Sequence, residues 1–468
     1  MIRFLVEKTL FCTFLVILTV LFIQSGHGVI CAAETKAHPA ASFTNKDIVA
    51  SGDLFSLARC IEIALVKNPE IAASHWDIAA ADARHDAAQA AFWPQVSAEG
   101  SYQRYVDDQR LIQAGSNGEP GVFDNDILRS DVIAKINLFA GGRMMNEAGA
   151  AAKLSSAEKQ KLIRTRHELI YSIVGVYYSI LGQQRIIASF AFSQKALDEN
   201  LKRTEQLYEA RKVAKVDVLR TEVRLSDLQQ NFIREKNVLA VQRRILFTLM
   251  GYDTVPENAR FEDELEYNIK TSFKTDELIE KALKNRPDFM AAKEQLAAQI
   301  LKVSAARASY WPNLNLVATY GVRNAPSPED EGRNTKTTED AGSVGVLLSF
   351  PLFDGGQIRA KVREEEAGLA AARERLRKLD LQIRQETETA SLDVLSNAER
   401  TKAMSAAIEQ ARESFRIESL KYELGKGSIT DVLDAQAAQL LSETNYCRAC
   451  VDYQISMARL RLATGENL

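Results

Sequence analysis

Two long stretches of the chain place apolar residues three and four positions apart, the spacing of one face of an α-helix. They cover residues 143–210 and 357–424. The positions at heptad spacing are Leu162, Leu169, Val176, Phe190 and Leu197 in the first stretch and Ile408, Phe415 and Tyr422 in the second. No proline interrupts either stretch, and one interior proline would cost a helix about 3 kcal/mol. The pattern predicts two helices of roughly 68 residues, about 100 Å long, that pack as coiled coils.

Each long helix is followed by a short segment and then by a second helical pattern. The short segments are residues 211–215 and 425–428, and the second patterns end near Gly251 and Gly465. Gly425 stands where a helix needs a residue in the left-handed conformation in order to end. The sequence therefore predicts that both long helices turn back on themselves.

Four shorter segments alternate apolar and polar residues, which is the period of a β-strand with two different faces. The predicted strands are about 95–106, 127–139, 313–323 and 342–353. Each is about ten residues long, the length of a tilted transmembrane strand, although a small soluble sheet with one wet face has the same pattern. The segments between paired strands, 107–126 and 324–341, are rich in turn formers and acids and are predicted to be solvated loops.

The chain is internally duplicated. Five landmarks occur twice in the same order, 218 residues apart up to Trp93 and 214 residues apart from Leu138 onward. Pro69-Glu70 recurs as Pro287-Asp288, Trp93-Pro94 as Trp311-Pro312, Leu138-Phe139-Ala140-Gly141-Gly142 as Leu352-Phe353-Asp354-Gly355-Gly356, Asp217-Val218-Leu219 as Asp431-Val432-Leu433, and Gly251 as Gly465. Each half is predicted to run short helix, helix, strand, strand, long helix, helix.

The N-terminus has the composition of a secretory signal peptide. Arg3 and Lys8 flank an apolar run of about 14 residues, which is short for a membrane span, and small residues follow. An uncleaved anchor is the alternative. The predicted organisation is a signal peptide at 1–33, a linker at 34–52, a first repeat at 53–252, an inter-repeat linker at 253–275 and a second repeat at 276–468.

Composition and motifs argue against most other classes of protein. The net charge of −3 gives no basic face for a nucleic acid. A glycine-rich phosphate loop, an H-E-x-x-H pair and a G-x-S-x-G elbow are all absent from the sequence, so we expect neither an enzyme nor a cofactor. Cys447 and Cys450 form a C-x-x-C within a helical pattern, and we expect them to pack rather than to bind metal or act in redox chemistry. His75, His85 and His167 are likewise expected to be ordinary surface or core residues.

Strand number bears on the oligomeric state. Four strands cannot close a barrel, and an open sheet edge cannot lie in lipid. Two copies would give eight strands with a filled interior, whereas three would give twelve with room for a lumen. If the strands span a membrane, the sequence predicts a homotrimer whose long helices extend the barrel as a hollow tube.

The repeated motifs resemble those of the TolC-type outer-membrane efflux proteins. The resemblance covers residue 53 to the C-terminus and rests on the N-P-E and R-P-D helix openings, the two W-P strand starts, both L-F-x-G-G turns and the Y-E-L-G-K-G-S-I-T-D-V-L-D segment. It implies a mainly α fold with a transmembrane β-barrel, built from a duplicated helix–strand–strand–helix unit as a trimeric twelve-stranded barrel with a periplasmic α-helical coiled-coil tunnel.

The implied function is a passive, gated exit duct from the periplasm to the exterior, in a tripartite efflux or type I secretion system. The implied partners are a periplasmic adaptor (membrane fusion) protein, an inner-membrane pump, either proton-driven or of the ABC type, and outer-membrane lipid. The exported substrate stays open. A periplasmic structural coiled-coil protein without a membrane barrel is the alternative.

The resemblance also implies roles for residues at the helical turns. Asp431 and Asp434 match positions that ring the periplasmic entrance, Tyr422 matches a residue of a polar lock, and Asp217 is the first-half counterpart of Asp431. The family places an arginine of that lock where this chain has Gly427, with Lys426 as a possible substitute. The implied adaptor-contact tip comprises Arg211, Val213, Lys215, Gly425, Gly427, Ser428 and Ile429. Simple N-capping of the returning helix by Ser428 or Asp431 is the alternative for the gate.

Overall fold

The computed structural model describes residues 54–468 except for 113–121, 257, 263–272, 327–337 and 467–468. The predicted signal peptide and the linker that follows it lie outside the described residues. Both predicted long helices are confirmed, and each contains 67 residues. The helices are α2 (Leu57–Lys67), α3 (Pro69–Ala90), α4 (Arg143–Glu209), α5 (Lys215–Leu249), α6 (Thr275–Asn285), α7 (Pro287–Ala308), α8 (Gln357–Glu423) and α9 (Ile429–Thr464).

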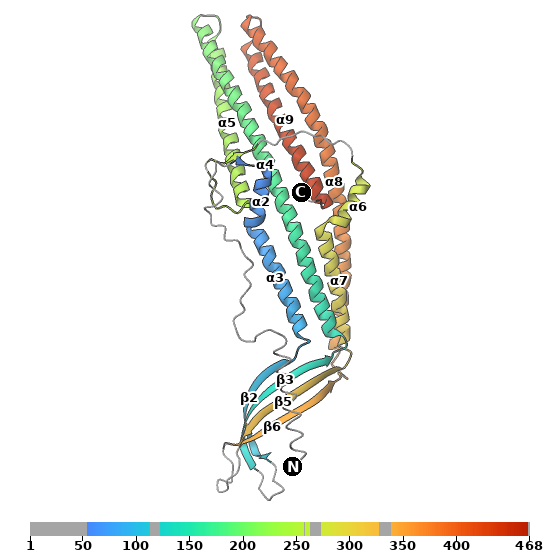
Figure 1. Cartoon of the computed structure of the whole chain (residues 1–468). Helices are drawn as coiled ribbons and strands as arrows, with labels where there is room; N and C mark the ends of the chain where they lie inside the picture. The colour runs from blue at the N-terminus through green and yellow to red at the C-terminus, as the bar shows by residue number, and fades with distance from the viewer. Residues whose placement is uncertain (1–53, 113–121, 257, 263–272, 327–337, 467–468) are drawn as a thin grey trace. The chain divides into compact units, whose positions relative to one another are not determined.

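The helices form two hairpins that pack side by side. α4 packs against α5, and α8 packs against α9, while contacts between α4 and α9 join the two hairpins (Figure 1). Ile173, Tyr177 and Ile180 of α4 are completely buried. Gly182 lets α4 and α9 approach closely, because a Cβ atom at this position would overlap the side chain of Val451.

The four long strands form one antiparallel sheet in the order β2-β3-β5-β6, at the end of the helices remote from the hairpin turns (Figure 1). They are β2 (Gln95–Ile112), β3 (Val122–Phe139), β5 (Asn313–Asn324) and β6 (Thr338–Ser349). The central pairing of β3 with β5 joins the two halves of the chain, with Val132 opposite Tyr320. β2 and β6 are therefore the two edges of the sheet.

The strand ends differ from the sequence prediction at β2, β3 and both ends of β6, which begins at Thr338 instead of 342, within the predicted loop 324–341. β2 and β3 continue through residues 107–112 and 122–126, which were predicted to be loop, because the pairing resumes beyond Arg104 after a register shift. β6 ends at Ser349 instead of 353. Pro351 has no N–H to donate to a strand ladder, which accounts for the early end.

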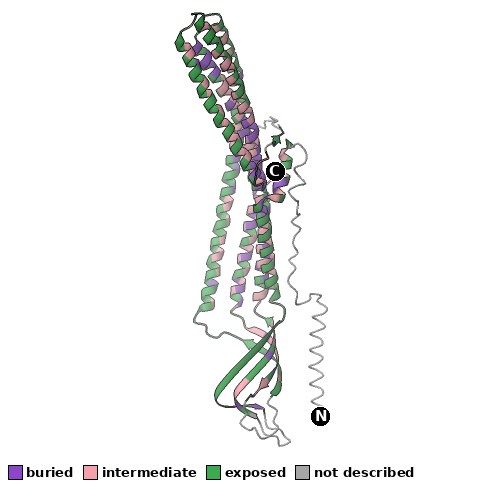
Figure 2. Ribbon diagram, turned by 90° about the vertical axis from the view of Figure 1, so that its left-hand side faces the viewer, coloured by how far each residue is buried: buried purple, intermediate pink, exposed green. Residues whose placement is uncertain are grey.

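The two faces of the sheet carry different chemistry. On one face the register brings together Val96, Tyr102, Leu128, Val132, Tyr320, Val344, Val346 and Leu348. The opposite face carries mostly polar residues, among them Ser97, Glu99, Arg129, Asp131, Asn315, Thr319 and Ser343. The apolar face is nevertheless open in the protomer, since Val346 is 61% and Leu348 64% exposed (Figure 2). An exposed apolar face of this size indicates a surface that another molecule covers in the functional protein.

A short parallel sheet that the sequence did not predict ties the two repeats together. It pairs β1 (Leu54–Phe55) with β4 (Arg260–Phe261), which lies within the predicted inter-repeat linker. The buried Tyr177 hydroxyl of α4 lies 2.9 Å from the Phe55 carbonyl oxygen and 2.8 Å from that of Glu262. Strands of two residues carry no periodic signal, so pattern analysis could not have found them.

The C-x-x-C cysteines, Cys447 and Cys450, lie in the middle of α9. Cys450 is buried, and Cys447 is partly buried. Burial raises the pKa of the Cys447 thiol to about 11, so it is protonated at neutral pH. Among the helices of the described residues, none is both long enough and apolar enough to cross a membrane.

Candidate functional site

The candidate site is the end of the helical part where both hairpins turn. A shared apolar core lies just below the two turns. Its buried members are Leu197 of α4 and Ile429, Val432 and Leu433 of α9, and Leu225 and Leu228 of α5 and Phe415 and Tyr422 of α8 pack against them. All four long helices therefore meet in one small core, and the turns are held above it.

The two turns share a backbone conformation but not a residue type. Gly425 has φ of 68°, which confirms the predicted left-handed ending of α8. Arg211 occupies the equivalent place after α4, with a φ of 57°. Among the described residues, Arg211 is the one residue other than glycine whose φ is positive. A side chain in this conformation costs about 1 kcal/mol relative to glycine, so the first turn is strained where the second is not.

Asp431, one of the two predicted entrance aspartates, and its first-half counterpart Asp217 are capping residues at the helix starts. The Asp431 carboxylate accepts a hydrogen bond from the Ser428 N–H at 3.4 Å, and the Ser428 hydroxyl accepts one from the Thr430 N–H at 3.1 Å. Asp217 accepts the N–H of Ala214 at 3.3 Å in the same way. The capping interpretation is therefore confirmed for Ser428 and Asp431. A gating role for these residues stays a prediction.

Asp434 lies one turn further along α9 and pairs with the first repeat. Its Oδ1 lies 3.1 Å from Nη2 of Arg224 on α5. The neighbouring Arg220 donates a hydrogen bond to the Thr430 hydroxyl at 3.3 Å. On the other side of the turns, Arg203 of α4 lies 2.8 Å from Glu423 of α8. Sequence reasoning did not single out these three arginines, although the duplication aligns Arg220 with Asp434.

Tyr422 and Lys426 take no part in the contacts of Asp431 and Asp434 described above. The Tyr422 ring packs on the apolar core, and its hydroxyl is buried without a hydrogen-bond partner among the described residues of the protomer. Lys426 is exposed in the second turn.

Gly427 has a steric reason for lacking a side chain. A Cβ atom there would lie 3.0 Å from Lys421 Cβ and 3.1 Å from the Tyr422 nitrogen. An arginine at this position would therefore require Lys421 and the backbone of Tyr422 to give by a few tenths of an ångström.

The remaining predicted tip residues differ in exposure. Ile429 is buried in the core, Val213 and Gly427 are partly exposed, and Arg211, Lys215, Gly425 and Ser428 are exposed. The first turn thus presents the cations Arg211, Lys212 and Lys215 to solvent, and the second presents Lys426.

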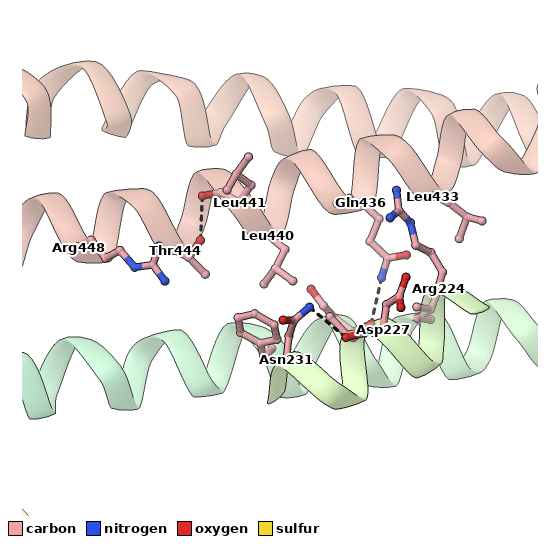
Figure 3. A pocket seen from close by; sticks show the side chains of 14 residues that line it. Arg224, Asp227, Asn231, Leu433, Gln436, Leu440, Leu441, Thr444 and Arg448 are labelled. Carbon is pink, nitrogen blue, oxygen red and sulfur yellow. Dashed lines mark hydrogen bonds between the residues drawn. The ribbon is translucent and has the colours of Figure 1, made fainter. Parts of the chain in front are cut away.

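A groove of about 270 Å³ runs from this tip between the two hairpins (Figure 3). Arg224, Asp227 and Asn231 of α5 face Leu433, Gln436 and Leu440 of α9 across it. Gln436 donates from Nε2 to the Ser193 carbonyl of α4 at 3.0 Å. The described residues contain no group of three or more His, Cys, Asp and Glu side chains that could hold a metal ion.

The duplicated hairpins, the two-faced open sheet and the convergent tip together define an outer-membrane channel subunit. The sequence matches the outer membrane efflux protein family over residues 60–252 and 278–466, which is most of both repeats, and the chain belongs to this family. The chain is thus an outer-membrane exit duct with a helical part in the periplasm, in a family of channels rather than enzymes.

Individual relatives show the same likeness at low identity. Outer membrane protein OprJ of Pseudomonas aeruginosa is 25% identical over 426 residues, which cover 87% of this chain and 84% of that relative. Outer membrane protein TolC of Vibrio cholerae is 22% identical over 408 residues, covering 80% and 92%. The solved outer-membrane channel OprN superposes with a TM-score of 0.74 at 24% identity and covers 88% of this chain and 90% of its own.

Proposed function

We propose that three copies of this chain close a twelve-stranded barrel in the outer membrane and a helical tunnel in the periplasm. The resulting duct is passive, and an inner-membrane pump supplies the energy through a periplasmic adaptor. The observation that carries this proposal is the sheet, which has one apolar face open to the surroundings and two edge strands paired on one side only. Lipid covers such a face, and a neighbouring copy satisfies such edges.

The pairing of the sheet edges determines how the copies assemble. β2 of one copy would pair with β6 of the next, because these are the strands with an unused side. Each backbone group left unpaired in lipid would cost several kcal/mol, so an isolated four-stranded sheet is not stable there. Twelve strands also leave a lumen lined by the polar face, with Arg129 and Asp131 as an ion pair on it.

The outer helices of the protomer support the same assembly. Near the turns α5 and α8 are the ends of the row α5-α4-α9-α8, so within the described residues each has one side at the edge of this row, while further along α8 also packs against α6 and α7. α5 carries exposed apolar residues at helical spacing: Ile233, Val241 and Ile245, and nearer the turn Val216, Leu219 and Val223, which line a groove shared with α9. Burial against a helix of the next copy gives these residues a partner and closes the tunnel wall.

The tip is the proposed place of both the gate and the adaptor contact. The gate group is Asp431, Asp434, Tyr422, Lys426 and Asp217. The adaptor-contact group is Arg211, Val213, Lys215, Gly425, Gly427 and Ser428, with Ile429 buried beneath them in the shared core. The three exposed cations of the first turn favour an acidic segment of the adaptor at that turn. The second turn, with one exposed lysine, would meet a less charged segment.

The rival, a periplasmic coiled-coil protein with a soluble sheet, predicts a different response to charge on the sheet. Val346 and Leu347 are adjacent on β6 and both exposed, but they point to opposite faces. Val346→Lys places a charge on the proposed lipid face, where it costs about 2–4 kcal/mol near the bilayer centre. Leu347→Lys places the same charge on the proposed lumen face and serves as the matched control.

The experiment expresses both variants and the parent chain, separates outer membranes, and scores heat-labile trimers by gel electrophoresis and pores in planar bilayers. We expect the parent and Leu347→Lys to give membrane trimers that conduct and Val346→Lys to lose them. Equal behaviour of the two lysine variants, or a parent chain that stays monomeric outside the membrane without detergent, would refute the barrel.

A further inference from the structure

The internal duplication identifies a helix contact that one copy of the chain cannot make by itself. Within the protomer, α4 packs against α9. With the offset of 214 residues, α4 is equivalent to α8 and α9 is equivalent to α5. The equivalent of the α4–α9 contact would therefore join α8 to α5. These two helices lie at opposite ends of the row of four and make no comparable contact in the described residues of the protomer.

The face of α8 that this contact would use is exposed. Gly182 and Val174 of α4 are buried against α9. Their equivalents on α8, Ser396 and Glu388, are exposed. α8 therefore presents the face that α4 buries, without a helix that covers it at these positions.

The face of α5 that would meet α8 is exposed in the same way. Val451 and Ala458 of α9 are buried against α4, at 8% and 5% exposure. Their equivalents on α5, Asn237 and Arg244, are exposed. A helix face that is buried in one repeat and open in the other indicates a neighbour that lies outside the single chain.

The sheet edges place that neighbour on the same side. β2 and α5 belong to the first repeat and form one end of the sheet and one end of the helix row, while β6 and α8 form the other ends. One rotation that brings β6 of a second copy to β2 therefore also brings its α8 to α5. The missing neighbour is a second copy of this chain.

We infer that α5 of one copy packs against α8 of the next in the register of the α4–α9 contact, with Asn237 against Ser396 and Arg244 against Glu388. The inference rests on the proposed trimer and specifies which residues meet in it. The two helices run antiparallel, so one turn toward the sheet from Asn237 and Ser396 the same register brings Val241 to Leu392. Both of these side chains are exposed in the protomer, at 51% and 58%, and this seam would bury them.

The seam between copies carries charge where the seam within the protomer is apolar. Val174 and Ala458 share an apolar cluster, whereas their equivalents are the anion Glu388 and the cation Arg244. Among the described residues Glu388 makes no ion pair, and Arg244 donates to the neutral carbonyl oxygen of Asp253. Opposite charges at matching positions favour a second copy of this chain over a related subunit that lacks either charge.

Disulfide cross-linking in isolated outer membranes tests the register, with the pair Asn237→Cys and Ser396→Cys in one chain. The matched control pairs Asn237→Cys with Ala403→Cys, because Ala403 is exposed on the same face of α8 but lies two turns, about 10 Å, further along. A disulfide needs Cα atoms within about 7 Å. The parent and the single variants show any cross-linking through the native cysteines, and heat-labile trimers before oxidation show that each variant is assembled.

We expect oxidation to give covalent dimers and trimers that withstand heating without reductant, at least tenfold more abundant in the Ser396 pair than in the Ala403 pair. Assembled trimers that cross-link in the Ala403 pair, or in neither pair, would overturn the register and leave the duct intact. A parent chain that forms no trimers would instead refute the proposed barrel, and the register with it.

Charge reversal tests the ion pair separately. Arg244→Glu and Glu388→Arg each remove it from three seams, at up to about fivefold per exposed pair, and place like charges together. We expect the fraction of chain that runs as trimer to fall about tenfold or more in each, and to return toward the parent value when both changes are combined. The matched control is Arg459→Glu, because Arg459 pairs with Asp393 at 2.9 Å inside the second hairpin. Equal losses in Arg244→Glu and Arg459→Glu, or no recovery in the combined variant, would overturn the pair.

Discussion

The two repeats reach the same backbone with different side chains. α4 and α8 have equal length and both begin after a glycine in the left-handed conformation, Gly142 and Gly356. At other equivalent positions the chemistry differs, with Asn68 against Arg286, Ala140 against Asp354, Arg211 against Gly425 and Ala214 against Ser428. Helix length and turn position are thus set by the hydrophobic pattern and the glycines, and the polar residues at the junctions are free to diverge.

The clearest divergence is at the start of the second helix in each repeat. Asn68 caps α3 by accepting the Glu70 N–H at 2.8 Å, and its amide donates to the Leu249 carbonyl. Arg286 has no capping role. It is 2% exposed and bonds Asp288 and Glu386, each at 2.6 Å. One junction is held by neutral hydrogen bonds and the other by a buried cation.

The largest predicted effect follows from this difference. Arg286→Ala leaves Asp288 half-buried without its partner and should lower the free energy of unfolding by about 3–5 kcal/mol. Asn68→Ala should cost about 1–2 kcal/mol, the value of a cap and one hydrogen bond. Chemical denaturation followed by helical circular dichroism in detergent gives both values. Equal losses of unfolding free energy in the two variants would show that the ion pairs of Arg286 stabilise their junction no more than the Asn68 cap stabilises its own.

The same junction predicts an acid dependence. Burial alone would raise the pKa of Asp288, but the Arg286 guanidinium outweighs it and holds that pKa below its ordinary 3.8. A depressed carboxyl pKa stabilises the fold above the unfolded value, and this contribution is lost as the pH falls below about 4. Stability of the parent should therefore decline in that range, and Asp288→Asn should decline less steeply from a lower starting value. Parallel pH profiles would contradict this.

The glycines before the long helices give the next comparison. Gly141 and Gly355 are equivalent and have φ of 61° and 66°. A Cβ atom at Gly141 would lie 2.6 Å from Trp311 Cβ and 2.7 Å from the Ala308 oxygen, whereas nothing lies within 4 Å at Gly355. Gly355→Ala should cost about 1 kcal/mol of backbone strain, and Gly141→Ala about 2–4 kcal/mol because overpacking is added. The melting temperatures of the two variants test the difference in stability between them. Equal melting temperatures would show that Trp311 moves aside without cost.

Much of this fold follows from the sequence because its patterns are long and occur twice. The long helices and the four strands depend on periodicity over ten or more residues. A local exception, such as the polar Gln183 at the heptad position between Val176 and Phe190, does not erase such a pattern. The predicted ends of β2 and β3 were wrong because Asp107, Asp108 and Asp124 are typical turn residues. Asp107 and Asp108 lie in the irregularity between Arg104 and Gln109, and Asp124 pairs with Gln109, which depends on the neighbouring strand.

The site was less predictable for a physical reason. Capping depends on residues three apart, so Ser428 and Asp431 could be identified from spacing alone. The contacts of Arg203, Arg220 and Arg224 join helices far apart in the sequence, and no spacing rule relates such partners. The crowding at Gly427 depends on how the second turn folds over Lys421, which the residue types do not determine.

The smallest predicted effect concerns the caps at the tip. The hydroxyl of Ser428 caps α9, while the equivalent Ala214 offers α5 no side-chain acceptor, although Asp217 completes half of the same motif. Ser428→Ala should cost about 1 kcal/mol, and Ala214→Ser should gain about 0.5–1 kcal/mol by completing the missing half. Hydrogen exchange of the first-turn amides of α5 and α9 measures each change locally, where a global melt would hide it. If Ala214→Ser fails to slow exchange in α5, the left-handed Arg211 three residues before it strains the turn too much for a serine to cap. The difference between the two tips then lies in the backbone conformation and not in the cap.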